Sequence, residues 1–147
     1  MPKRLAILRH AKSDWGDPGL ADFDRPLNAR GRAAAESIGR ALEQRDIVFD
    51  AILSSPARRT RETLELIGLA SATTWLEPLY HASPERLLDA VRRLPDDAAS
   101  ALIVGHNPGL QQLVLALSAP DANGFRAAVE TKFPTAALAL LDLAIDD

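Results

Sequence analysis

The chain has 147 residues and a formal net charge of −3; 47% of the residues are hydrophobic, 25% are charged and none is cysteine. This length suits one domain with a full core, so we expect residues 1–147 to form a single domain. The acidic balance argues against a general nucleic-acid-binding protein, whose affinity rests on excess positive charge. The lack of cysteine excludes disulfides, thiolate metal sites and a cysteine nucleophile.

The apolar runs of the chain are all short. None of them approaches the ~18 residues of a membrane span. The first one, within MPKRLAILRH, is too short for a signal peptide and is better used as a strand. We therefore expect a cytoplasmic protein that does not bind membranes.

Strand and helix signals alternate from the first residues onward. Residues 3–8 form a mainly apolar run that predicts a buried strand. Apolar residues at helical spacing predict a helix from Asn28 or Ala29 to Arg45. A second strand is expected over residues 47–53. Ser55-Pro56 then supplies an N-cap and a first helical position, which predicts a helix to about residue 69.

The second half continues the alternation. Residues 73–80 predict a third strand, and Pro78 within it indicates an edge or irregular strand. Ser83-Pro84 begins a helix that runs through Arg93, by the same capping pattern. A buried strand is expected at residues 101–104, and a helix from Asn107-Pro108 to about Leu117 follows it. A last strand is expected at residues 136–143.

This order of elements predicts an α/β fold. Helices on both faces of a mostly parallel sheet form a three-layer α/β/α sandwich. Two long stretches, 11–27 and 119–134, carry no clear element signal. Long loops of this kind tend to be functional or mobile.

Polar residues gather where the predicted strands end. Arg9 and His10 follow the first strand, Arg58 and Arg59 open the helix after the second, and His106 follows the fourth. The carboxyl ends of parallel strands share one edge of a sheet, which is where open α/β sheets hold ligands. Helix N-termini add partial positive charge at this edge. The set therefore predicts an anion site, most naturally for phosphate.

Each of these residues also has a structural interpretation. His10 could be a hydrogen-bonded residue at a strand end, His106 could cap a helix, and one of Arg58 and Arg59 could lie on a solvated face. Only three histidines occur in the chain, and two of them fall at the predicted edge, which favours function. Two histidines and a carboxylate can bind zinc. However, no HExxH spacing occurs and the arginines would repel a cation, so we expect no metal.

Three motifs occur in a fixed order: LRHAK at 8–12, SPARR at 55–59 followed by Thr63, and VGHNP at 104–108. Together they resemble the histidine phosphatase superfamily, which includes phosphoglycerate mutases and acid phosphatases. The short length, RHAKSDW, Arg25-Pro26-Leu27 followed by Gly31, and GHNPGL are similar to its small SixA-type phosphohistidine phosphatase branch. The resemblance implies a phosphoglycerate mutase-like fold and phosphatase activity.

The resemblance also implies roles for four residues. His10 matches the nucleophile that becomes phosphorylated in the family. Arg9 and Arg59 match its two phosphate-binding arginines, and His106 matches the second histidine of its pocket. Arg59 is favoured over Arg58 because the family's second arginine lies four residues before a threonine, here Thr63. Ala11 stands where many relatives have glycine, a small change that the small branch accepts.

The expected chemistry follows from these residue types. Only a neutral imidazole can attack phosphorus, and nearby arginines disfavour the charged form of His10 by lowering its pKa. Arg9, Arg59 and a protonated His106 would bind the phosphoryl oxygens in the transition state. Water then hydrolyses the phosphohistidine, so no metal or cofactor is expected.

The proton donor for the leaving group is the open question. In the superfamily's mutases a glutamate supplies this proton, and Glu77 falls near the corresponding position. His81 and Glu85 are weaker candidates, since Glu85 fits a first-turn helix charge. Lys12 is a candidate for contact with the substrate phosphate. Trp15 in the same loop could be a lid or a packed anchor, and we favour the anchor.

Three functions therefore remain open. The first is a cofactor-independent phosphatase that uses His10 on phosphohistidine in proteins, since a phosphoramidate leaves without much help from an acid. The second is a small-molecule phosphomonoesterase with Glu77 as its acid. The third is a module that binds phosphate or phosphoproteins with little turnover, which would need the arginines but no nucleophile.

Overall fold

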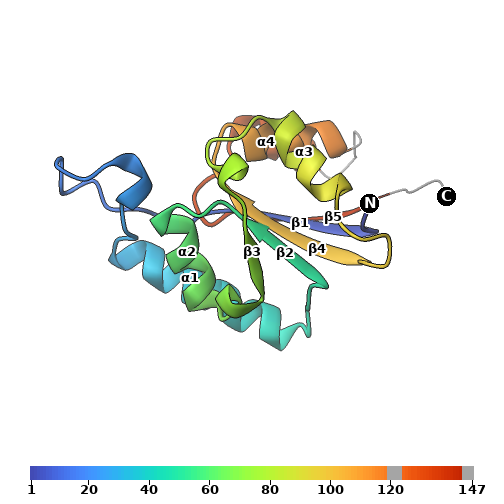
Figure 1. The fold of residues 1–147 in the computed structure, drawn as a ribbon, viewed down its shortest axis with the longest axis horizontal. Coiled ribbons are helices and arrows are strands. Elements are labelled where there is room, and N and C mark those ends of the chain that lie inside the picture. The colour runs from blue at the N-terminus through green and yellow to red at the C-terminus, as the bar shows by residue number, and fades with distance from the viewer. Residues whose placement is uncertain (119–123, 144–147) are drawn as a thin grey trace.

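A five-stranded sheet lies at the centre of the molecule, with helices on both of its faces (Figure 1). The computed structural model describes residues 1–118 and 124–143. The strand order is β3-β2-β4-β1-β5. The strands are β1 (Arg4–Arg9), β2 (Ala51–Ser54), β3 (Thr73–Trp75), β4 (Ser100–Gly105) and β5 (Leu138–Asp142). The first four are parallel and β5 is antiparallel to β1, which confirms the predicted mostly parallel sheet.

The helices form the two outer layers of the sandwich. One layer contains α1 (Ala29–Gln44) and α2 (Arg58–Ile67), and the other contains α3 (Pro84–Arg92), α4 (Gly109–Leu117) and α5 (Phe125–Thr131) (Figure 1). Three short 3₁₀ helices are η1 (Asp22–Asp24), η2 (Ala70–Ala72) and η3 (Glu77–Leu79). Within the described ranges, no helix is long and apolar enough to cross a bilayer.

The central strand β1 shows why the sequence forms this sandwich. Leu5 and Ile7 belong to the apolar cluster that includes residues of α3, α4 and α5. Ala6 and Leu8 belong to a second cluster, with residues of α1 and α2 packed against it. A strand covered on both faces must be apolar at every position, which explains the continuous run at the start of the chain.

Two predicted boundaries move near the second strand. This strand begins at Ala51 rather than residue 47, because the segment before it is a connection in which Val48 is exposed. The following helix begins at Arg58, with Ala57 as its N-cap. Ser55 therefore does not cap it, and the Ser55 hydroxyl instead accepts a hydrogen bond from the Ala57 amide at 3.3 Å.

Two other predictions need correction. The third strand ends at Trp75, and the Pro78 region forms η3, because proline cannot donate to a sheet ladder. The stretch 119–134 was expected to be a loop, but its residues 125–131 form α5 after Gly124, whose φ is 74°. This helix is too short to show a clear apolar period. Residues 119–123 lie outside the described part of the chain.

Candidate active site

The ends of β1, β2 and β4 meet at one edge of the sheet, because these strands are neighbours in the order β2-β4-β1. A cavity of about 420 Å³ opens there. The structure brings together five of the six predicted site residues in its lining, namely Arg9, His10, Lys12, Arg59 and His106. The other lining residues are Ser13, Trp15, Asp22, Arg25, His81, Asn107, Lys132, Pro134 and Thr135.

The His10 ring is fixed in one neutral tautomer. It is 6% exposed, and its Nδ1 lies 2.6 Å from the carbonyl oxygen of Ala11. Because a carbonyl only accepts, Nδ1 carries the proton and Nε2 keeps a free lone pair. Burial lowers the pKa of His10 to about 4; the bond to Ala11 opposes this shift, and the charges of Arg59, Arg9 and Arg25 add to it. The ring is therefore neutral near pH 7, as predicted.

The second histidine is neutral as well. The ring of His106 is centred 5.3 Å from that of His10, and its Nδ1 accepts from the Arg59 guanidinium at 3.1 Å. Its Nε2 therefore carries the proton and donates to the Ser55 hydroxyl at 2.8 Å. Burial and then the charge of Arg59 lower the pKa of His106 to about 2. The protonated His106 expected from the sequence is thus not the form that this structure favours.

Arg59, which is buried, and Arg9, which is partly buried, supply positive charge to the cavity. Arg59 is 2% exposed, and it donates to the backbone oxygen of Asp22 at 2.7 Å and to its carboxylate at 3.0 Å. Arg9 donates to the carbonyl of Phe133 at 3.2 Å. Within the described residues, the Nε atoms of both arginines are buried and have no hydrogen-bond partner. Arg58, in contrast, is exposed, pairs with Glu62 and does not line the cavity, so Arg59 is the arginine that reaches the site.

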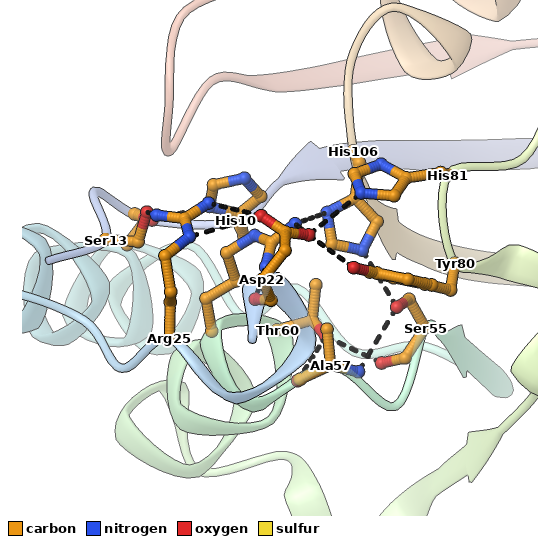
Figure 2. A network of polar contacts seen from close by, with 12 residues as sticks. His10, Ser13, Asp22, Arg25, Ser55, Ala57, Thr60, Tyr80, His81 and His106 are labelled. Carbon is orange, nitrogen blue, oxygen red and sulfur yellow. Dashed lines mark hydrogen bonds and ion pairs between the residues drawn. The ribbon is translucent and has the colours of Figure 1, made fainter. Parts of the chain in front are cut away.

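Asp22 was not predicted from the sequence, yet its carboxylate joins both sides of the cavity (Figure 2). Oδ1 accepts from Arg25, and Oδ2 accepts from Arg59, the Tyr80 hydroxyl and His81 Nε2. Burial opposes ionisation, but hydrogen bonds from Tyr80, His81 and Arg25 outweigh it and hold the pKa of Asp22 well below its usual range. Asp22 is therefore a carboxylate at any physiological pH. Its only signal in the sequence is its position in a long loop.

Trp15 is not the packed anchor that we expected. Its side chain is 75% exposed at the mouth of the cavity. The guanidinium carbon of Arg25 lies 3.5 Å from the centre of its ring. Arg25 is itself buried and bonded to Ser13 and Asp22, so a fixed cation supports an aromatic ring that faces solvent.

The structure does not bring the predicted proton donor to the cavity. Glu77 is exposed in η3 and does not line the cavity, and Glu85 is exposed in the first turn of α3. His81, which the sequence analysis considered a weaker candidate, does line the cavity. Lys12 lies at the cavity as predicted, together with Lys132, which the sequence analysis missed because it falls in the second stretch without a clear signal.

The loop after β1 is fastened to both helices of its layer. The Leu27 amide donates to Glu62 of α2 at 2.8 Å. A Cβ at Gly31 of α1 would lie 2.1 Å from the carbonyl oxygen of Lys12, so only glycine permits this approach. These contacts set the position of Asp22 and Arg25 relative to the strand ends.

Known proteins match the chain in sequence. Residues 5–82 match the profile of the histidine phosphatase superfamily (branch 1). The uncharacterized protein Rv1276c of Mycobacterium tuberculosis is 36% identical over 139 residues, which cover 93% of this chain and 87% of that protein. The uncharacterized chloroplastic protein At3g52155 of Arabidopsis thaliana is 33% identical, and the match covers 79% of this chain and 59% of that protein.

Solved structures match the fold. A protein from Agrobacterium tumefaciens, provisionally named phosphohistidine phosphatase SixA, superposes with a TM-score of 0.86 at 37% identity and covers 97% of this chain and 93% of its own. A protein histidine phosphatase SixA complexed with tungstate has a TM-score of 0.76 at 23% identity, and the match covers 93% of this chain and 86% of that protein. The second likeness concerns the fold alone.

Proposed function

We propose, since the chain belongs to the histidine phosphatase superfamily, that it is a phosphatase whose nucleophile is Nε2 of His10. The observation that carries this proposal is the neutral His10 ring, whose proton is held on Nδ1 by Ala11 among buried arginines. A buried base with a free lone pair beside fixed cations suits attack on an anionic phosphoryl group.

The reaction has two steps. The Nε2 lone pair of His10 forms an N–P bond while the bond from phosphorus to the leaving group breaks, and the leaving atom keeps that electron pair and takes a proton. Water then attacks phosphorus, the N–P bond breaks, and inorganic phosphate leaves with His10 neutral again. Neither step requires a metal or a cofactor.

The arginines stabilise the transition state of both steps. Charge develops on the three equatorial phosphoryl oxygens, and donors fixed before the reaction bind it without reorganisation. Arg9 and Arg59 both line the cavity in which these oxygens would lie. Because both ring nitrogens of His106 are engaged, we infer that this residue chiefly positions Arg59.

The proposed substrate is phosphohistidine in a protein. The Agrobacterium tumefaciens protein, which is 37% identical, carries the name phosphohistidine phosphatase, and this supports the proposed substrate class. The mouth of the cavity is lined by Lys12, Lys132 and the exposed Trp15, which suits a side chain presented on a protein surface. A module that only binds phosphate would need the arginines, but it would gain nothing from the tautomer of His10.

The test compares wild type with His10→Gln on phosphoramidate and on a protein that carries phosphohistidine. We expect release of phosphate from both substrates by wild type and a loss of more than about 1000-fold in the variant. Lys3→Gln, at the opposite end of β1, is the control and should behave as wild type. Full hydrolysis by His10→Gln would overturn the assignment, and binding of phosphate without turnover by wild type would favour the binding module.

A further inference from the structure

We propose that His81, oriented by Asp22, is the proton donor to the leaving group, so that the site also hydrolyses phosphate esters with poor leaving groups. This inference rests on the proposed phosphatase function. The expected glutamate lies outside the cavity, and an alkoxide leaving group needs a general acid. His81 is a titratable residue of the cavity that the two proposed steps do not yet use.

The position of His81 suits this role. Its ring is centred 5.0 Å from that of His106, which is in turn 5.3 Å from that of His10. The imidazole lies on the opposite side of Asp22 from Arg25 (Figure 2). Its Nε2 is 2.9 Å from Asp22 Oδ2, and this is the ring's only hydrogen bond within the described residues. Nδ1 is therefore left to contact a substrate, and the half-exposed ring lines the cavity.

The backbone supports a functional role for this histidine. His81 has a φ of 51°, in the left-handed region that residues with a Cβ rarely adopt. Strain of this kind persists where the surrounding structure enforces it, and it gathers at functional sites. Here the Ala82 amide bonds to the carbonyl of Leu79, and the Tyr80 ring lies 4.2 Å from the His81 ring. The turn thus directs His81 back toward the cavity.

Asp22 cannot supply the proton itself. Four side chains donate to its carboxylate, so it stays ionised, and it orients the His81 ring as a carboxylate orients a histidine in other acid–base pairs. An imidazole can both give and accept a proton, which a residue that acts as acid in one step and as base in the next requires. The ionisable groups next to the His81 ring are Asp22, Tyr80 and His106, and Arg59 of α2 bonds to the same oxygen of Asp22. Arg25 lies beyond Asp22, on its other carboxylate oxygen.

The proton balance closes over the two steps. In the first, protonated His81 gives its Nδ1 proton to the leaving nitrogen or oxygen as that atom takes the electron pair of its bond to phosphorus. His81 is then neutral. In the second step Nδ1 accepts a proton from the attacking water, which restores the protonated ring when phosphate is released.

The test varies the leaving group in wild type and His81→Gln. Glutamine can still donate to Asp22, but it cannot transfer a proton. For 4-nitrophenyl phosphate, whose leaving group needs no acid, we expect kcat/KM within about 3-fold of wild type. For phenyl and alkyl phosphates we expect a loss of about 100-fold or more. An equal loss on all substrates would overturn the proposal, since it would show a merely structural role.

Tyr80→Phe is the matched control, because it also removes a donor to Asp22 but no acid. Tyr80→Phe should lower kcat/KM for all of these substrates by the same factor. If His81→Gln does not fold, the leaving-group dependence of wild type decides the question: a shallow dependence supports a proton donor and a steep one contradicts it. Failure of the proposed function is distinguishable, because a phosphate adduct on His10 with 4-nitrophenyl phosphate should form in wild type and in His81→Gln alike.

Discussion

The backbone amide of Ala11 donates a hydrogen bond of 3.0 Å to the hydroxyl of Thr63, which joins the residue after His10 to the middle of α2. The same hydroxyl donates to the carbonyl of Arg59, one turn earlier, at 2.7 Å. One threonine therefore links the backbone next to His10, whose ring is oriented by the Ala11 carbonyl, to Arg59, which we propose binds phosphate. This explains physically why an arginine four residues before a threonine belongs to the site.

Thr63→Val tests this connection. Valine has nearly the same shape, but it leaves the buried Ala11 amide without its acceptor, which costs about 1–3 kcal/mol of the free energy of unfolding. We also expect kcat to fall, because the Ala11 carbonyl that orients His10 is released. Denaturant unfolding and steady-state kinetics measure the two effects. Thr131→Val, at an exposed helix position, should change stability by less than about 0.5 kcal/mol.

Arg59 and Arg58 form a natural matched pair. The Arg59 fork bonds to Asp22 and His106 at once, which a single ammonium group cannot reproduce. We expect Arg59→Lys to lower kcat/KM on phosphoramidate by about 100-fold or more. Arg58→Lys changes only an exposed ion pair with Glu62 and should match wild type. Equal effects of the two changes would contradict the assignment.

The protonation of His10 gives a spectroscopic prediction. Its pKa of about 4 means that ring-nitrogen NMR at pH 7 should show a neutral imidazole with the proton on Nδ1. The ring should take up a second proton only as the pH falls to about 4. His10→Gln assigns the signals. A midpoint near the ordinary value of about 6.5 would contradict the buried environment described above.

The same shift makes stability depend on pH. Unfolded His10 binds a proton below about pH 6.5, whereas the folded residue does so only near pH 4. The contribution of His10 to stability is therefore fully present above about pH 6.5 and is lost as the pH falls toward 4, because the unfolded state binds more protons there. Between pH 7 and pH 5, we expect the unfolding free energy of wild type to fall more than that of His10→Gln, by on the order of 1 kcal/mol. Equal changes would argue against the prediction.

Trp15 should affect large substrates more than small ones. The Arg25-backed ring at the cavity mouth offers a contact surface worth about 0.5–1.5 kcal/mol to an aromatic or protein partner. Trp15→Ala should therefore raise KM for a phosphohistidine protein by about 2- to 10-fold and leave KM for phosphoramidate unchanged. Leu20→Ala removes another exposed apolar residue of the same loop and serves as the control. An equal rise for both substrates would show a general disturbance of the loop.

The sequence predicted the residues that follow strands. Arg9, His10 and His106 could be found because an apolar run marks each strand, and parallel strands end at one edge. Arg59 was harder to identify, because only its spacing to Thr63 distinguishes it from Arg58. The mostly parallel sheet could be predicted because strand and helix signals alternate along the chain. The helix α5 was not predicted, because its seven residues are too few to show a helical period.

The groups that surround the strand-end residues of the cavity could not be predicted from the sequence. Asp22 contacts Tyr80 and His81 across separations of 58 and 59 residues, and no local pattern encodes such a contact. The neutral state of His106 was also missed, because it depends on burial and on the guanidinium at its Nδ1. Charge type can be read from a sequence, but the protonation state is set by packing.

The central claim is covalent catalysis by His10, and rapid-quench mass spectrometry of the protein mixed with phosphoramidate tests it most directly. We predict a phosphate adduct that maps to His10, appears within the first turnover and decays as phosphate is released. Turnover with no adduct on His10 at the shortest times would contradict this account, since it would mean that water attacks the substrate directly.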